Sequence, residues 1–141
     1  MSSYLGQTKQ ILGHPNTVKN GSKYIMIVDD QPDILDLLQG YLESKGLKIK
    51  TFIGPGIALL SLMTNPKLYS LIITDIRMPE MDGIQATRII KTKIAQLPVI
   101  VLTLYSEYRE AALAAGANAF LLKGEPVEQL MAVLLAACST N

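Results

Sequence analysis

Hydrophobic and polar positions alternate along this chain in blocks that predict strands followed by helices. Four short apolar runs each finish on a polar residue, and they span residues 24–30, 71–75, 98–103 and 120–123. A fifth run, 47–52, carries Lys48 and Lys50 at alternating positions, which is typical of an edge strand. Apolar residues at helical spacing follow each run, so the pattern predicts five strand–helix units.

The predicted helices are bounded by residues that commonly begin and end helices. Pro32 occupies a first helical position with Asp33 beside it, and Gly46 ends that helix. Ser106 is predicted to cap a later helix, which Gly116 closes. The five helices are expected over residues 32–45, 54–63, 84–94, 107–115 and 126–137.

Units joined this closely predict an α/β fold with a parallel sheet. A closed barrel of eight such units needs about 250 residues, whereas this chain has 141. Of the common open arrangements, five strands in a chain of this size favour the flavodoxin-like order 2-1-3-4-5. We therefore expect an open, doubly wound, five-stranded parallel sheet with helices on both faces.

The length of the chain and its Gly and Pro residues predict one domain with an extension. Residues 1–22 show little periodicity and are expected to be a flexible N-terminal extension. The domain is expected to cover 23–138, with a tail at 139–141. No apolar run approaches the roughly 18 residues of a membrane span, and the start lacks a signal peptide's apolar stretch. We therefore expect a soluble, cytoplasmic protein without membrane contact.

Composition and charge narrow the class further. The chain is 49% hydrophobic and 18% charged, which is typical of a globular domain. The chain has thirteen basic and twelve acidic residues. It therefore lacks the excess of positive charge that would predict direct nucleic-acid binding by this domain. The single cysteine, Cys138, cannot form an internal disulfide, which fits a reducing compartment.

Polar residues at the carboxyl ends of the predicted strands indicate a shared site. In the order 2-1-3-4-5, Asp29, Asp30 and Asp75 meet at the switch point of the sheet, and Thr103 and Lys123 follow neighbouring strands. Three carboxylates this close repel one another unless a proton or a cation relieves them. A hard divalent cation with oxygen ligands, Mg²⁺ first, is the simplest solution. Phosphoryl transfer is the chemistry that this set of groups suggests.

Four segments together carry a family resemblance. They are Val28-Asp29-Asp30, the stretch from Thr74 to Gly83 with its Asp-x-x-Met-Pro-x-Met-Asp-Gly pattern, Leu102-Thr103, and Gly116-Ala117 through Lys123. In register, they resemble the receiver domain of two-component response regulators over about residues 23–137. The resemblance implies a phospho-accepting signalling switch served by a sensor histidine kinase or a phosphotransfer protein. It implies no dedicated enzyme, only Mg²⁺-dependent self-phosphorylation from small donors and slow autodephosphorylation.

The same resemblance implies a role for each acidic residue. Asp75 is then the phosphoacceptor, which forms a hydrolysable acyl phosphate. Asp30, Asp75 and the backbone carbonyl of Arg77 are expected to hold Mg²⁺ directly, while Asp29 acts through water.

The resemblance also implies a switch on the neighbouring strands. Lys123 is expected to pair with one phosphoryl oxygen and Thr103 to hydrogen-bond another. Movement of Thr103 vacates space into which the Phe120 ring can rotate.

The chain departs from the family pattern at three positions. Gly124 follows Lys123 where the family commonly has Pro, and we predict a trans bond there because a cis bond before Gly costs about 3 kcal/mol. Leu104 is bulkier than usual and narrows access to Asp75. Phe120 lacks the hydroxyl of the frequent Tyr.

The segments 102–105 and 120–124 are similar to receivers of LuxR/NarL-type regulators. Either the chain is a stand-alone receiver, or it is the receiver of a longer DNA-binding regulator whose output domain is missing here, and the sequence does not decide between the two.

Three other functions stay open on sequence grounds. A flavin or nucleotide site would need a Gly-rich or Ser/Thr-rich turn after the first strand, where this chain has Asp29 and Asp30. A metal-dependent hydrolase with an Asp nucleophile would need an acid/base carboxylate, for which Glu80 is the only loop candidate. A receiver fold kept only for interaction would fit better had Asp75 or Lys123 been replaced.

The last predicted helix is unusually apolar. Val127, Leu130, Leu134 and Ala137 fall on one face and should pack on the sheet. Met131, Val133 and Leu135 are then left at the flanks or outside. Either the buried stripe is wide, or the helix mediates self-association, and a homodimer through this helix is one expected partner arrangement.

Overall fold

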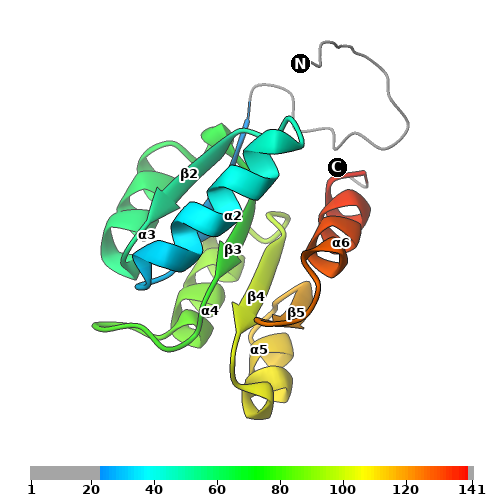
Figure 1. Cartoon of the computed structure of the whole chain (residues 1–141). Helices are drawn as coiled ribbons and strands as arrows, with labels where there is room; N and C mark the ends of the chain where they lie inside the picture. The colour runs from blue at the N-terminus through cyan, green and yellow to red at the C-terminus, as the bar shows by residue number, and fades with distance from the viewer. Residues whose placement is uncertain (1–22, 140–141) are drawn as a thin grey trace.

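The molecule is built around one parallel sheet of five strands. A computed structural model describes residues 23–139, and the sheet order is β2-β1-β3-β4-β5 (Figure 1). The strands are β1 (Tyr24–Val28), β2 (Ile49–Phe52), β3 (Tyr69–Thr74), β4 (Val99–Thr103) and β5 (Ala119–Leu122). Because the order matches 2-1-3-4-5 and every pairing is parallel, the predicted flavodoxin-like sheet is confirmed.

Five α-helices cover the two faces of this sheet. They are α2 (Pro32–Ser44), α3 (Pro55–Thr64), α4 (Gly83–Lys93), α5 (Arg109–Ala114) and α6 (Val127–Ser139). Side chains of α2 and α6 pack together on one face, whereas α3, α4 and α5 contribute to the clusters on the other. Because all five strands run parallel, their carboxyl ends lie at the same edge of the sheet (Figure 1).

The predicted helix boundaries hold except in the region before α5. Pro32 begins α2, and Gly46 follows its end with a φ of +88°, a conformation that favours glycine. Ser106 does not cap a helix: Ser106–Tyr108 form a 3-10 turn, and α5 begins only at Arg109 with no side-chain cap. The prediction for Ser106 was wrong because the chain forms one 3-10 turn, which is tighter than an α-helical turn, before α5 begins.

The buried stripe of α6 is wide. Leu130 and Leu134 are buried, while Met131, Val133 and Ala137 are half-buried against the same cluster. The exposed positions of α6 up to Ala137 are Glu128, Gln129, Ala132 and Ala136. No large apolar side chain in the described part of this helix is exposed, although Leu135 is half-buried outside that cluster. Self-association through this helix stays a prediction.

The predicted extension, residues 1–22, lies outside the described residues, as do residues 140–141 of the predicted tail. Ser139, which was assigned to that tail, is the last residue of α6. Among residues 23–139, no helix has both the length and the apolar character that a bilayer span requires.

Candidate functional site

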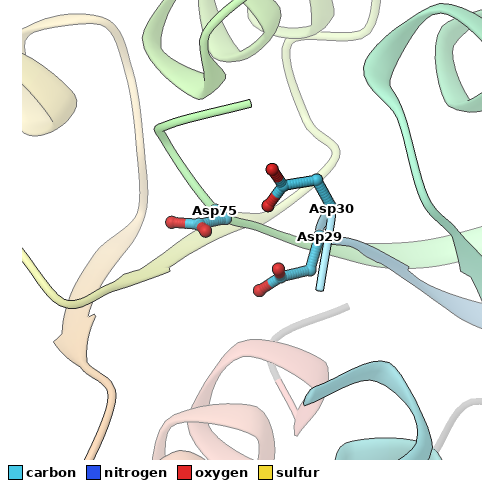
Figure 2. Close-up of side chains that lie close together, drawn as sticks. All are labelled: Asp29, Asp30 and Asp75. Carbon is cyan, nitrogen blue, oxygen red and sulfur yellow. The ribbon is translucent and has the colours of Figure 1, made fainter. Parts of the chain in front are cut away.

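Three carboxylates gather where β1 and β3 end. Asp29 and Asp30 directly follow β1, and Asp75 directly follows β3 (Figure 2). Val28 pairs with Thr74 in the sheet, so the residues that come next are neighbours. One carboxylate oxygen from each Asp lies within 4.8 Å of the others. The predicted convergence of these three residues is confirmed.

Lys123 joins two of these carboxylates from the end of β5. Its ammonium lies 2.7 Å from Asp29 Oδ2 and 2.9 Å from Asp75 Oδ2. It also donates to Gln31 Oε1 at 3.2 Å. The Lys123 backbone N–H donates to the Thr103 carbonyl at 2.8 Å, which ties β5 to β4 at this edge. The three hydrogens of the ammonium are therefore matched by three acceptors.

Burial and ion pairing shift the pKa values of Asp29 and Lys123. Burial raises the pKa of the Asp29 carboxyl above its ordinary 3.8, although hydrogen bonds from Lys123 and from the Gln31 N–H act in the opposite direction. Burial alone would lower the pKa of Lys123, but hydrogen bonds and charge from Asp29 and Asp75 outweigh it and raise that pKa. Lys123 is therefore held as a cation between the two carboxylates.

The donor set fits a hard divalent cation. Lys123 pairs with Asp29 and Asp75 but not with Asp30, so the three carboxylates, when ionised, carry more negative charge than the one ammonium offsets. Asp29 is buried against Lys123, whereas Asp30 is exposed and lines an open cleft of about 180 Å³. Asp75 and Arg77 also line this cleft. Both carboxylate oxygens of Asp29 are already paired, one with the Gln31 N–H and one with Lys123, and the metal roles of Asp30 and Asp29 stay predictions.

The loop between β3 and α4 folds tightly against Asp75. Asp75 Oδ1 accepts the Ile76 N–H at 2.7 Å, and the Gly83 N–H donates to the Ile76 carbonyl at 2.8 Å. A Cβ added to Gly83 would lie 1.9 Å from the Asp75 carbonyl oxygen, so only glycine fits there. Asp82 caps α4 by accepting the Gln85 N–H at 2.8 Å. The Asp82-Gly83 pair thus holds the loop that orients Asp75.

Thr103 differs from the other polar residues of this edge because its hydroxyl is unpaired. The residue is fully buried at the end of β4, and its Oγ1 is the buried side-chain atom without a partner among the described residues. A hydroxyl in this state costs free energy until an acceptor or donor reaches it. Phe120 is already buried in a cluster with Val101 and Ala112, and the Arg109 guanidinium lies 5.8 Å from its ring centroid.

The structure adds two residues to this edge that the sequence reasoning missed. Gln31 contacts both Asp29 and Lys123, and its position directly after the acidic pair was the available signal. Tyr105 stacks under the Arg77 guanidinium at 4.8 Å from the ring centroid and lines the cleft beside the exposed Leu104. No pattern in the sequence pointed to this stacking, because Arg77 and Tyr105 lie in different loops.

The residue after Lys123 follows the prediction made for it. No cis peptide bond occurs among residues 23–139, so the bond to Gly124 is trans as predicted. Gly124 has a φ of +92°, which a proline could not adopt.

The chain is similar to known proteins over most of its length. A family model described as the response regulator receiver domain matches residues 25–135. An uncharacterised 14.6 kDa protein of Leptolyngbya boryana is 40% identical over 79% of this chain and 85% of its own length. The response regulator SaeR of Staphylococcus aureus is 32% identical over 71% of this chain, but the match spans only 43% of SaeR.

Solved structures show the same fold. The response regulator protein TrrA from Thermotoga maritima, in complex with Mg²⁺ and BeF, is 31% identical with a TM-score of 0.76. The alignment covers 82% of this chain and 98% of TrrA.

Proposed function

The chain belongs to the response regulator receiver domain family, and we propose that it is a switch that accepts a phosphoryl group on Asp75. The observation that carries this assignment is the meeting of three carboxylates, Lys123 and an unpaired Thr103 hydroxyl at one edge of the sheet. Binding of partner proteins changes once the phosphoryl group is attached.

The proposed reaction is a transfer between two side chains. A carboxylate oxygen of Asp75 forms a bond to phosphorus while the bond from phosphorus to the imidazole nitrogen of a phosphohistidine breaks. The imidazole leaves with the electron pair of that bond and takes up a proton from water. A small acyl phosphate can replace the phosphohistidine, with a carboxylate as the leaving group. Hydrolysis of the aspartyl phosphate by water resets the switch slowly, and we assign the chain no other chemistry.

We propose that Mg²⁺ is bound by Asp30, Asp75 and the backbone carbonyl of Arg77, with Asp29 acting through water. When bound, the cation neutralises charge on the phosphoryl oxygens. Asp29 supports this arrangement by holding Lys123 at the site. The two side chains form an ion pair of 2.7 Å before any phosphoryl group is attached.

Lys123 and Thr103 are proposed to contact the phosphoryl group once Asp75 is phosphorylated. A phosphoryl oxygen competes with Asp75 Oδ2 for the ammonium of Lys123, and another oxygen offers the Thr103 hydroxyl the partner that it lacks. Movement of Thr103 alters the packing of the cluster that holds Phe120. The two packings form the bistable element of the switch.

The phosphodonor protein is proposed to dock in an apolar groove next to the site. This groove of about 210 Å³ lies between α2 and the start of α6, with Leu37, Tyr41, Val127 and Leu130 among its lining residues. Lys123 lines both the groove and the cleft around Asp75, so a helix seated in the groove could present a phosphohistidine to the acceptor. The expected partner is a sensor histidine kinase or a phosphotransfer protein.

Acetyl phosphate tests the acceptor assignment directly. The wild-type chain should gain the mass of one phosphoryl group when Mg²⁺ is present and none when it is chelated, because the carboxylates then repel the donor. Asp75→Ala should gain none under either condition. Asp82→Asn is the matched control, since it removes a nearby loop charge while keeping the cap of α4. Undiminished labelling of Asp75→Ala would end the proposal.

The docking groove has a separate test. Leu37→Glu places a charge on an exposed wall of the groove and should slow phosphotransfer from a phosphorylated sensor kinase by roughly 10-fold or more. The rate with acetyl phosphate should stay unchanged, because that donor needs no docking. Equal slowing with both donors would place the defect in the site and not in the groove.

A further inference from the structure

The outer face of α3 carries a continuous apolar patch. Among residues 23–139, seven large hydrophobic side chains are exposed, and four of them are Ile53 (66%), Ile57 (67%), Leu60 (68%) and Met63 (39%). Ile57, Leu60 and Met63 lie along one side of α3 by their spacing, and Ile53 lies just before the helix begins. Ala58 and Leu62, on the other side of α3, are buried. Figure 1 shows α3 at the β2 side of the molecule, opposite α6. We call these four residues the α3 patch.

The α3 patch lies in an uncharged stretch of the chain. No Asp, Glu, Lys or Arg occurs from residue 53 to residue 65. The exposed side of α2, in contrast, includes Asp33, Asp36 and Glu43. A two-fold symmetric contact places each residue against the same surface of the other copy, so any net charge at its centre would repel itself. The α3 patch has no such charge.

Opposite charges lie at the two ends of the α3 patch. Glu80 lies against the N-terminal end of α3, where a Cβ built on Gly56 would be 3.4 Å from its Oε1. Lys67 lies just past the C-terminal end, in the turn Pro66–Leu68. Both residues are exposed, and neither forms an ion pair with another described residue. If two copies of α3 pack antiparallel, Glu80 of each copy approaches Lys67 of the other.

We propose that the α3 patch is a self-association surface, on which two copies of this chain pack α3 against α3 in antiparallel orientation. The occupant is a second copy because the patch is self-complementary: it is apolar at its centre and has opposite charges at its ends. This inference goes beyond the phosphoacceptor role and does not depend on it, since α3 contributes no side chain to the acidic site.

The size of the α3 patch predicts a weak and reversible dimer. Four side chains at these exposures amount to roughly 400 Å² of apolar surface, which is large for a monomer. With its polar surroundings, the contact reaches the low end of specific interfaces, about 1,000 Å² in total. A dissociation constant on the order of 10–100 µM is therefore expected.

Sedimentation equilibrium of the full chain tests the surface. Across a concentration series spanning that range, the wild type should shift from monomer to dimer. Leu60→Glu should weaken the dimer roughly 100-fold or more, because each interface then contains two buried charges. Leu37→Glu is the matched control: Leu37 is equally exposed, at 68%, but lies on α2, and the variant should dimerise as the wild type does.

A charge exchange tests the antiparallel orientation. Glu80→Lys and Lys67→Glu should each weaken the dimer several-fold, because each creates two like-charge pairs across the two-fold axis. The double variant restores opposite charges and should recover most of the wild-type affinity. Failure of the double variant to recover would overturn the orientation.

Other outcomes would overturn the surface itself. These are a wild type that remains monomeric throughout, a dimer that survives Leu60→Glu, and a dimer lost equally in Leu37→Glu. Binding of the wild type, but not of Leu60→Glu, to phosphatidylcholine–phosphatidylglycerol vesicles without dimerisation would assign the patch to a lipid surface instead. Beryllofluoride binding by Leu60→Glu should match the wild type, so failure of this inference is distinguishable from failure of the acceptor assignment.

Discussion

The two halves of the functional edge differ in how well their polar groups are satisfied. At the ends of β1 and β3, Asp29 and Asp75 share the ammonium of Lys123, and Asp75 Oδ1 also accepts a backbone N–H. At the end of β4, the buried hydroxyl of Thr103 has no partner among the described residues.

This difference separates the half of the edge that binds ligands from the half that changes its packing in response. A group arriving at the satisfied half must displace an existing contact, so binding there is a competition for Lys123 and the carboxylates. A group arriving at the unsatisfied half adds a hydrogen bond that was missing, and this gain can stabilise an altered packing. The comparison predicts different consequences for substitutions in the two halves.

The largest expected effect is on Mg²⁺ binding in the acidic half. Asp30→Ala should weaken Mg²⁺ binding by roughly 100-fold or more, since Asp30 is the exposed carboxylate proposed as a direct ligand. Asp29→Ala should weaken it less, by roughly 10-fold, because a ligand acting through water contributes less. Titration calorimetry with Mg²⁺ measures both, with Asp33→Ala as the control for removal of a nearby exposed acid. Equal losses for Asp29→Ala and Asp30→Ala would erase the distinction between their roles.

Lys123 connects the halves, and its removal should separate binding from response. Lys123→Ala should bind Mg²⁺ as well as the wild type or better, because a competing positive charge is removed. It should nevertheless lose the beryllofluoride-induced change in amide exchange around Thr103 and Phe120. Hydrogen exchange with and without beryllofluoride measures this. A change that persists in Lys123→Ala would make Lys123 a structural partner of Asp29 alone.

The smallest effect concerns stability in the unsatisfied half. Thr103→Val removes a buried hydroxyl that has no partner and should raise the free energy of unfolding by about 1 kcal/mol. Thr87→Val is the matched control: Thr87 is also fully buried, but its hydroxyl donates to the Gly83 carbonyl at 2.7 Å. The free energy of unfolding of Thr87→Val should fall by about 1 kcal/mol. Urea unfolding of both variants measures the difference, and destabilisation by Thr103→Val would show that the hydroxyl is already paired.

The two most apolar helices, α3 and α6, show the limit of sequence patterns. The spacing of residues in α6 pointed to a helix with leftover apolar side chains, yet Met131 and Val133 pack against the core. In α3, Ile57 and Leu60 belong to an equally apolar segment but are exposed. Position in the fold explains the difference: Met131 and Val133 of α6 pack against the cluster that α6 shares with α2, whereas Ile57 and Leu60 lie on the side of α3 that no described element covers.

The sequence by itself determined the strands and the residues at their functional edge, while the sheet order was chosen as the common arrangement for five such units. It could do so because strands are short apolar runs, and parallel strands bring their carboxyl ends to one edge. The local signals at Pro32 and Gly46 were equally readable because caps and turns depend on near neighbours.

Only the tertiary structure decided how these residues share their contacts. The pairing of Lys123 with Asp29, Asp75 and Gln31 joins three strand ends that are up to 94 residues apart in the chain (123 − 29 = 94). The unpaired state of Thr103 and the exposure of α3 also depend on which distant elements pack nearby. Burial and hydrogen-bond partners are properties of the assembled fold, and spacing along one segment carries no information about them.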